Sequence, residues 1–349
     1  MARKPRKPAK PAITNPWHVH GPGDKAIRKT EKLFLEGYKD ELKNLNELLV
    51  DFFNRNATNG LLTYADVAAN GRLSSLLHRI REGVDKAFDL RKKVISGGLR
   101  AAADDAYTDI LYQAEKLAYA RTVSRNKTNI LPMESRLEPS VLEGVGDMYN
   151  EWFGGQGMNG IRPTEEALNA LHEHSQTQLQ NRLRAALTGA GTDIRTWQRF
   201  LQDELSKDAG RFLRVLHTDG NRIVNEAKLV AFKSDYMEAV RTALGVREDG
   251  FVEGTGMCEI WRHDEPKTAR EWHITQLDNT VPDLDGFWWS KHDGMISSAR
   301  GPGQFGVDIE DNYCRCYIDF GFPEDARGMS TKDGVVPVPK DYMQLRRKM

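Results

Sequence analysis

The chain has 349 residues and a mass of 39.5 kDa, which allows two or three domains and at least one sizeable buried core. Its 50 basic residues balance 50 acidic ones, so the protein as a whole has no net field that would attract nucleic acid or an anionic membrane. The apolar runs are too short for a membrane-spanning helix, the charged N-terminus lacks the apolar stretch of a secretory signal, and three cysteines exclude a disulfide scaffold and favour a reducing site of synthesis.

Residues 1–23 form a basic, proline-rich N-terminal arm. They contain five of the fourteen prolines and no acidic residue, and their basic residues are Arg3, Lys4, Arg6, Lys7 and Lys10. Proline removes amide donors and like charges repel, so we expect an extended segment and not a helix. Such an arm either keeps a terminus solvated or binds nucleic acid or an acidic protein surface.

Residues 24–125 have the apolar spacing of long helices. Apolar side chains recur at three- and four-residue steps from Ile27 to Phe52, which predicts one long helix. A second helical stretch opens at Thr63, and a third runs from Ala101 to Ala120 after a break at Gly97-Gly98. We therefore expect a first helical domain of antiparallel or stacked helices.

Residues 126–162 are interpreted as a linker or irregular loop, because they contain two prolines and a cluster of glycines. Helical periodicity returns at Pro163, whose following acidic residues suit the first turn of a helix. The pattern predicts a stop at Gly189, a new helix from Thr192 and a last one from Phe212 to Leu244. This second helical domain covers residues 163–250.

The composition changes after residue 250. Residues 251–322 hold all three cysteines, four of the seven tryptophans and several short apolar runs, which indicates a separate module of mixed helix and strand. Residues 323–349 are interpreted as a polar C-terminal tail. The predicted fold is therefore a predominantly α-helical, elongated body with a small C-terminal α+β module, in agreement with a mean hydropathy of -0.60.

Two glycine patterns and one histidine pair do not indicate ligand sites. The segments 155–160 and 301–306 match G-x-G-x-x-G, but neither is expected between a buried strand and a helix, as a dinucleotide site requires. His172 and His174 are two residues apart on a predicted helix, so they cannot form the metal pair that an i, i+4 spacing allows. We expect both histidines to be solvated.

An ordered set of chemically distinctive residues runs from Cys258 to Phe320. A tryptophan and an aspartate are followed by R-x-x-H, by Leu-Asp, by a Pro-Gly turn and by an Asn that precedes Cys-Arg-Cys. This layout resembles the phage Mu F-like head morphogenesis family. The matching positions are Trp261, Asp264, Arg270, His273, Leu277, Asp278, Pro302, Gly303, Asn312, Cys314, Arg315 and Cys316.

The match departs from the family pattern at two positions. Asn279 stands where the family has glycine, which is a mild change because asparagine also tolerates a left-handed turn. Tyr313 separates Asn312 from Cys314, and a one-residue shift in a strand changes which side chains face inward. Upstream, the stretch 221–231 is similar to the helix that precedes the module in the family, and the remainder of the chain matches only in its helical character.

The cysteines and one histidine of this module form a candidate metal site. Cys314 and Cys316, two apart in a strand, face the same side, and with His273 and Cys258 they can supply three or four soft ligands to a structural zinc ion. Two other states stay open: a disulfide formed after release, and reduced cysteines packed as small apolar groups beside a hydrogen-bonded histidine. We expect no other cofactor.

The charged motif residues are interpreted as structural. Arg270, Asp264 and Asp278 are expected to form a charge and hydrogen-bond network that holds loops. A histidine and a carboxylate can also form a catalytic base, here His273 with Asp278, but no nucleophile is identified beside them. We therefore expect a protein that is not an enzyme.

The resemblance implies a minor head, or minor capsid, protein of a tailed bacteriophage that acts in head morphogenesis or DNA packaging. Such a protein is made in the cytoplasm of the bacterial host and is present in few copies per virion, in the head interior or at the portal vertex. The implied partners are the portal protein and the major capsid protein, with packaged DNA as a partner of the basic arm and no membrane partner. Two alternatives stay open: an enzyme or toxin effector that carries a Mu F-like module, and a DNA-binding internal head protein ejected with the genome.

Overall fold

The computed structural model describes residues 21–68, 71–124, 139–158, 161–186, 191–234, 237, 258–263, 270–312 and 314–347, with backbone alone at 114–124 and 139–144. The basic residues of the predicted arm, Arg3, Lys4, Arg6, Lys7 and Lys10, lie outside these ranges. The chain divides into two compact units. Within the described ranges, unit 1 comprises 28–98 and 165–216, and unit 2 comprises 21–27, 99–164 and 217–347.

Long helices precede a small module of strands, which confirms the predicted fold class. The helices are α1 (Pro22–Asn56), α2 (Tyr64–Ala68), α3 (Arg72–Ser124), α4 (Pro139–Phe153), α5 (Thr164–Ala185) and α6 (Ile194–Phe232). Among the described residues, no helix combines the length and the apolar character needed to cross a bilayer.

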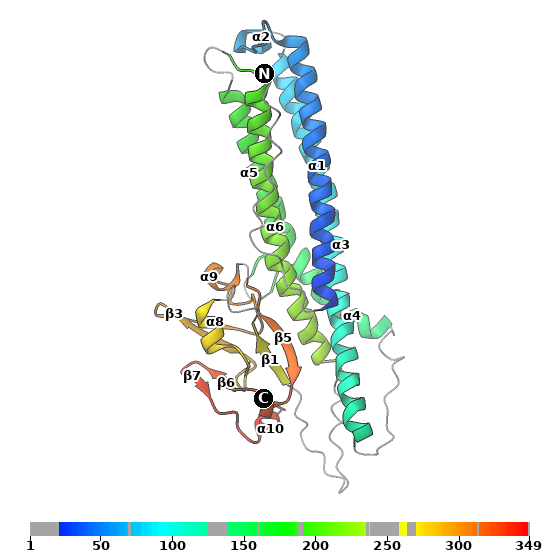
Figure 1. Ribbon diagram of the computed structural model, residues 1–349, viewed down its shortest axis with the longest axis vertical. Coiled ribbons are helices and arrows are strands. Elements are labelled where there is room, and N and C mark those ends of the chain that lie inside the picture. Colours follow the sequence, from blue (N-terminus) through cyan, green and yellow to red (C-terminus); the bar gives the residue numbers. More distant parts are fainter. Residues whose placement is uncertain are drawn as a thin grey trace, which may run out of the picture. The chain divides into compact units, whose positions relative to one another are not determined.

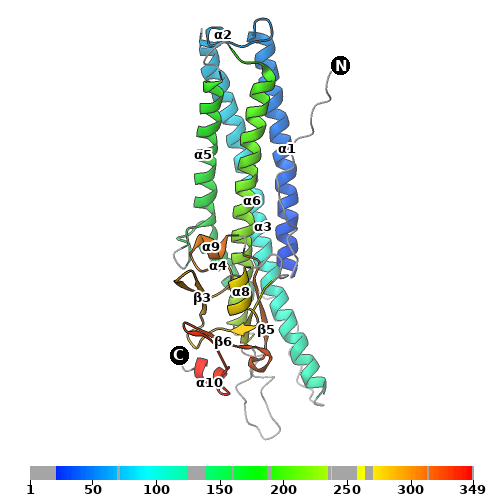
Figure 2. The ribbon, with the colours of Figure 1, turned by 60° about the vertical axis from the view of Figure 1, so that its left-hand side comes forward.

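Unit 1 is a bundle formed by parts of α1, α3, α5 and α6, which run side by side in both views (Figures 1 and 2). Thr30 of α1 faces Gly98 of α3, whereas Leu45 faces Gly83, so these two helices are antiparallel. The phenyl rings of Phe34 on α1 and Phe212 on α6 stack with their centroids 6.0 Å apart. The apolar residues that recur at three- and four-residue steps in the sequence thus form the core of the bundle.

Helix α3 continues through Gly97-Gly98, so the predicted break is wrong. A Cβ atom on Gly98 would lie 1.8 Å from Oγ1 and 2.6 Å from Cβ of Thr30, a buried residue of α1. A Cβ atom on Gly97 would meet nothing within 4 Å. Gly98 therefore permits a close helix crossing, and the rest of a long packed helix offsets the low helix propensity of both glycines.

Alanine at these two neighbouring positions should change stability in opposite directions. We expect Gly97→Ala to raise the free energy of unfolding by about 0.5–1 kcal/mol, the difference in helix propensity. Gly98→Ala should lower it by about 1–3 kcal/mol, because β-branched Thr30 cannot move its own Cβ out of the way. Urea denaturation followed by circular dichroism measures both changes, and stabilisation by both substitutions would contradict the close crossing.

A buried ionic cluster joins three helices of unit 1. Arg91 Nη1 of α3 lies 3.3 Å from Glu41 Oε2 of α1 and 3.7 Å from Asp208 Oδ2 of α6, and all three side chains are at most 3% exposed. The Arg91 guanidinium also lies 5.1 Å from the centroid of the Phe212 ring. Burial, only partly offset by Arg91, raises the pKa of Glu41 from its ordinary 4.5 to about 7.

This shift predicts a pH dependence of stability. Between pH 4.5 and 7 the folded protein binds more protons at Glu41 than the unfolded chain does, so stability should fall as the pH rises through this window. Glu41→Gln should remove the effect: we expect the variant to exceed wild type by at most about 3 kcal/mol at pH 8, and to match it near pH 4, below the unfolded pKa. Denaturation at both pH values tests this, and an equal loss at both would mean that the ion pair with Arg91 outweighs burial.

Two further predictions for the helical body are corrected. His172 is not solvated: its ring stacks on Phe88 at 4.0 Å between centroids, and its Nε2 lies 2.8 Å from Asp85 Oδ1, because this face of α5 packs on α3. His174 is exposed. The helices predicted from Thr192 and from Phe212 are one continuous helix, α6.

Part of the predicted linker 126–162 is helix α4, while residues 125–138 lie outside the described ranges. Val145, Met148 and Trp152 are buried and follow the three- and four-residue spacing of a helix face. Pro139 is the first residue of α4, a position where its missing N–H removes no helical hydrogen bond. The sequence interpretation therefore gave this proline too much weight as a helix breaker.

The module in unit 2 contains two sheets (Figure 1). The larger has the order β5-β1-β2-β6-β7, with β2 and β6 parallel and the other pairs antiparallel. Its strands are β1 (Cys258–Arg262), β2 (Thr280–Val281), β5 (Tyr317–Gly321), β6 (Gly328–Thr331) and β7 (Gly334–Val336). The smaller is a hairpin of β3 (Trp288–His292) and β4 (Met295–Ala299), and the short helices are α8 (Glu271–Gln276), α9 (Asp308–Asp311), the 3-10 helix η3 (Pro323–Asp325) and α10 (Tyr342–Arg347).

Residues 323–347 differ from the predicted polar tail. Strands β6 and β7 extend the large sheet, Met329 and Tyr342 are buried, and Arg346 Nη1 of α10 lies 2.5 Å from the buried Glu259 Oε2. Short strands bury few side chains, so their contribution to the core is not visible in the local composition. The module therefore continues beyond residue 322.

Polar side chains of α6 hold the free edge of β5. Asn225 Oδ1 accepts the Ile318 N–H at 2.9 Å, and Lys228 Nζ donates to the Ile318 carbonyl at 3.1 Å. Asn221 Nδ2 donates to the Cys316 carbonyl at 3.3 Å. These side chains take the place that a neighbouring strand would occupy. The stretch 221–231, which precedes the module in the sequence, thus belongs to unit 2 together with the module.

Candidate metal centre

Three donor side chains meet in the core of the module. His273 Nδ1 lies 3.5 Å from Cys316 Sγ and 3.9 Å from Cys314 Sγ, and all three donor atoms lie within 4.8 Å of one another. His273 is fully buried, and each cysteine is 2% exposed. The fold thus brings together three of the four residues that the sequence nominated as ligands.

Two separate segments supply these donors. His273 lies in α8, whereas Cys314 and Cys316 lie between α9 and β5. The Cys314 N–H donates to the Asp311 carbonyl at 3.0 Å, which turns the chain out of α9. The cysteines precede β5 and are not within it, yet both side chains pack in the same core cluster as Ile318. They therefore share a face, as expected of residues two apart in extended chain.

Cys258 does not belong to this group, contrary to the sequence interpretation. It packs with Ile260 and Tyr342 in one buried cluster, whereas Trp261 packs with the other two cysteines in a second cluster. Alternate residues of a strand face opposite sides, so Cys258 and Ile260 of β1 face away from Trp261. The three cysteines, all of them described, are not joined in disulfides.

Glu310 of α9 orients the imidazole from its other side. Its Oε2 lies 2.6 Å from His273 Nε2 and accepts the Trp272 indole N–H at 2.8 Å, and its Oε1 accepts the Ser290 hydroxyl at 2.9 Å. A proton held on Nε2 leaves Nδ1 directed at the two sulfurs. Histidines that bind metal commonly donate their second ring N–H to a carboxylate in this way.

Sequence reasoning missed Glu310, and the one carboxylate it considered as a partner of His273, in the catalytic alternative that it did not adopt, was Asp278. Asp278 Oδ2 lies 3.4 Å from Nε2 of His263, a different histidine. Glu310 lies in the motif region, two residues before Asn312, but α9 has only four residues and shows no periodicity that would place its side chain inward. The position of Glu310 near the motif is the only sequence signal that points to it.

The electrostatics of the group favour the charged forms of His273, Glu310 and Cys314 and the neutral thiol of Cys316. Burial alone would lower the pKa of His273, but contacts with Cys314 and Glu310 raise it to about 9. Burial also opposes ionisation of Glu310, yet hydrogen bonds from His273 and Trp272 hold its pKa below the usual value. The hydrogen bond from Cys316 lowers the pKa of Cys314 well below its usual value, whereas burial raises that of Cys316. At least one sulfur is therefore stabilised as thiolate, the form that binds metal.

The geometry fits a soft metal ion. Tetrahedral zinc with sulfur at about 2.3 Å and nitrogen at about 2.1 Å would place the nitrogen about 3.5–3.6 Å from each sulfur, close to the observed 3.5 and 3.9 Å between His273 Nδ1 and the two sulfurs. The buried Trp261 packs in the same core cluster as both cysteines, and its Nε1 has no hydrogen-bond partner among the described residues. Two sulfurs and one imidazole suit zinc and not magnesium or calcium.

Other motif residues hold the loops around the centre. Arg270 Nη2 donates to the Asn312 carbonyl at 2.5 Å. Asn279 has a φ of 56°, a left-handed conformation that asparagine tolerates. Arg315 is half-buried, and Asp264 lies outside the described residues.

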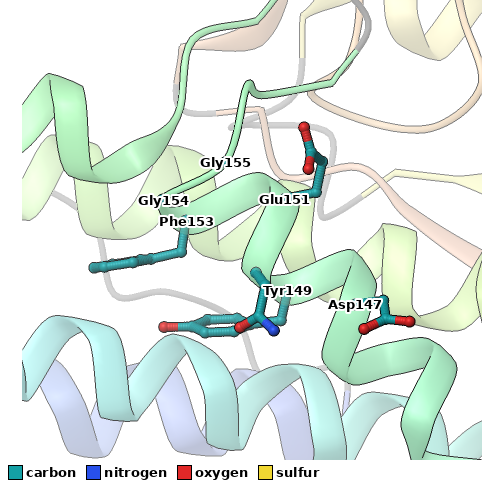
Figure 3. Close-up of a pocket in the computed structure, with 7 residues that line it drawn as sticks. Asp147, Tyr149, Glu151, Phe153, Gly154 and Gly155 are labelled. Carbon is teal, nitrogen blue, oxygen red and sulfur yellow. The ribbon is translucent and has the colours of Figure 1, made fainter.

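A hollow lies at the end of α4 (Figure 3). It is lined by a single segment of the chain, comprising Asp147, Tyr149, Asn150, Glu151, Phe153, Gly154 and Gly155. The rings of Tyr149 and Phe153 stack at 5.6 Å between centroids. Its titratable lining side chains are the carboxyl groups of Asp147 and Glu151 and the phenol of Tyr149.

Comparison of the chain with protein-family models, with curated proteins and with solved structures gives no match.

Proposed function

We propose that this chain is a structural head protein of a tailed bacteriophage, associated with the portal and acting in head morphogenesis or DNA packaging. The observation that carries the proposal is the convergence of motif residues similar to those of the Mu F-like family. Trp261, Cys314 and Cys316 belong to one core cluster, and the His273 imidazole faces both sulfurs. A scattered set of accidental matches would have no reason to meet in one buried centre.

Burial supports a structural role and not a catalytic one. A cysteine, His273 and Glu310 could serve as nucleophile, base and orienting acid. A substrate would have to reach the sulfur, however, and each of these side chains is at most 2% exposed. Turnover lost specifically in His273→Ala, with folding intact, would favour the enzyme or toxin alternative.

We assign His273, Cys314 and Cys316 as ligands of a structural zinc ion. Bound zinc would supply folding stability by joining α8 to the segment that precedes β5. The protein residues contribute a preformed donor set, with Glu310 holding the imidazole.

The proposed partners are the portal protein and the major capsid protein, together with packaged DNA at the basic arm. A DNA-binding internal protein ejected with the genome is the second candidate. The observation that favours it is the positive charge of the arm. Deletion of residues 1–10 tests DNA binding by the arm: salt-sensitive retention of DNA should be lost if the arm binds DNA, and unchanged retention would exclude that role and with it the second candidate.

Quantitative mass spectrometry of purified particles and of empty heads tests the main proposal. We expect few copies per particle, retained with portal protein. Peptides of the major capsid protein in the same sample serve as the reference from which the copy number is calculated. Absence from mature particles and from portal-containing assembly intermediates alike would overturn the proposal.

A further inference from the structure

We propose that Asn221 and Asn225 of α6 are positioning residues of the zinc centre, so that zinc binding and the hydrogen bonds of these two amides to the Cys316 carbonyl stabilise each other. This inference rests on the zinc centre proposed above. It concerns how the centre is coupled to the helix, which lies outside the set of ligands.

Cys316 takes part in both interactions. Its sulfur lies 3.5 Å from His273 Nδ1, while its carbonyl oxygen accepts hydrogen bonds from Asn221 Nδ2 at 3.3 Å and Asn225 Nδ2 at 3.4 Å. Asn225 also accepts the Ile318 N–H at 2.9 Å, so one amide side chain holds the backbone on both sides of residue 317. A change at this amide would therefore move the backbone that carries the sulfur.

The two asparagines form a rigid pair. Asn225 Nδ2 lies 3.2 Å from Asn221 Oδ1 and 2.9 Å from the Asn221 carbonyl, one helical turn earlier. Asn225 is fully buried, and Asn221 is 4% exposed. Buried amides with several hydrogen bonds have few alternative rotamers, so they fix the carbonyl they contact.

Helix α6 also anchors the segment that carries Cys314. Arg222 Nη2 lies 3.3 Å from Asp311 Oδ2, and Arg222 Nε donates to the Gly303 carbonyl at 2.5 Å. The Asp311 carbonyl in turn accepts the Cys314 N–H. Both sulfur ligands are thus positioned by α6 through their backbone, whereas Glu310 holds the third ligand, His273.

A metal ion bound across these groups would connect α8 to the segment that α6 anchors. Thermodynamic linkage then requires that contacts which favour the bound arrangement raise zinc affinity, and that zinc stabilise those contacts by the same free energy. Outer residues that orient metal ligands typically change affinity by about 10- to 100-fold when they are mutated.

The test compares Asn225→Ala with Lys228→Met in the full-length chain. Lys228 lies on the same face of α6 and donates to the Ile318 carbonyl, two residues beyond the sulfur ligand. Competition with a chromophoric chelator should show zinc affinity lowered by about 10-fold or more in Asn225→Ala and nearly unchanged in Lys228→Met. Hydrogen exchange should show that zinc protects the amides of residues 219–230 in wild type and in Lys228→Met, and protects them less in Asn225→Ala.

Equal zinc affinity in wild type and Asn225→Ala would overturn the inference, as would an equal loss in Lys228→Met. If Asn225→Ala does not fold, Asn221→Ala removes one of the two donors to the same carbonyl and should still lower affinity. Asn225→Asp keeps the acceptor for the Ile318 N–H but loses the donor, and it should lose affinity as alanine does. A wild-type chain that binds no zinc would refute the zinc centre itself. Zinc binding that is equally tight in wild type and Asn225→Ala would refute only the role of the asparagines.

Discussion

Cys316→Ser should abolish stoichiometric zinc binding and destabilise the C-terminal module. The hydroxyl is a poor replacement for a thiolate ligand, and loss of one of three protein donors leaves only His273 and Cys314. Structural zinc sites have apparent binding free energies of about 10 kcal/mol or more, so we expect the largest stability effect in the chain here. Zinc determination by mass spectrometry and thermal unfolding with and without a chelator measure the two effects.

Cys258→Ser is the matched control for this substitution. Cys258 is as deeply buried as Cys316 but lies in the other core cluster, with Ile260 and Tyr342. We expect it to lose some packing stability and to retain zinc. A chelator should lower the melting temperature of wild type and Cys258→Ser but not that of Cys316→Ser. Equal zinc content in the two variants would contradict the assigned ligands.

Glu310→Gln should cost about 3–5 kcal/mol of stability, the range for removing one partner of a buried ion pair. Glu310 accepts hydrogen bonds from His273, Trp272 and Ser290. A glutamine amide nitrogen cannot accept, so at least one buried donor would lose its partner. Urea denaturation measures the loss, and Asp308→Asn, an exposed change in the same short helix, should leave stability almost unchanged.

The effect of Glu310→Gln should also depend on pH. Because the pKa of Glu310 is held below its ordinary 4.5, the contribution of the carboxylate is complete above about pH 4.5 and is lost as the pH falls through the lower folded value. The difference between variant and wild type should therefore shrink in acid. A pH-independent difference, or a loss no larger than that of Asp308→Asn, would mean that the carboxylate charge does not stabilise the imidazole.

The helical body was predictable because helix periodicity is a local property. The spacing of apolar residues from Ile27 to Phe52 is sufficient to identify α1, and the shift in composition after residue 250 identifies the module. The prediction of a break at Gly97-Gly98 was wrong because glycine occurs both where a helix ends and where two helices pack closely together. Only the position of Thr30 on another helix distinguishes them.

The candidate centre was predictable in part, through residue types and their order. The sequence by itself determined that two cysteines two residues apart, and a histidine earlier in the module, were available as soft ligands. Tertiary structure decided that Cys258 faces the other core and that Glu310, and not Asp278, meets His273. The physical reason is that ligand type is a property of each residue, whereas a contact across 37 positions depends on strand register and on the packing of several segments at once.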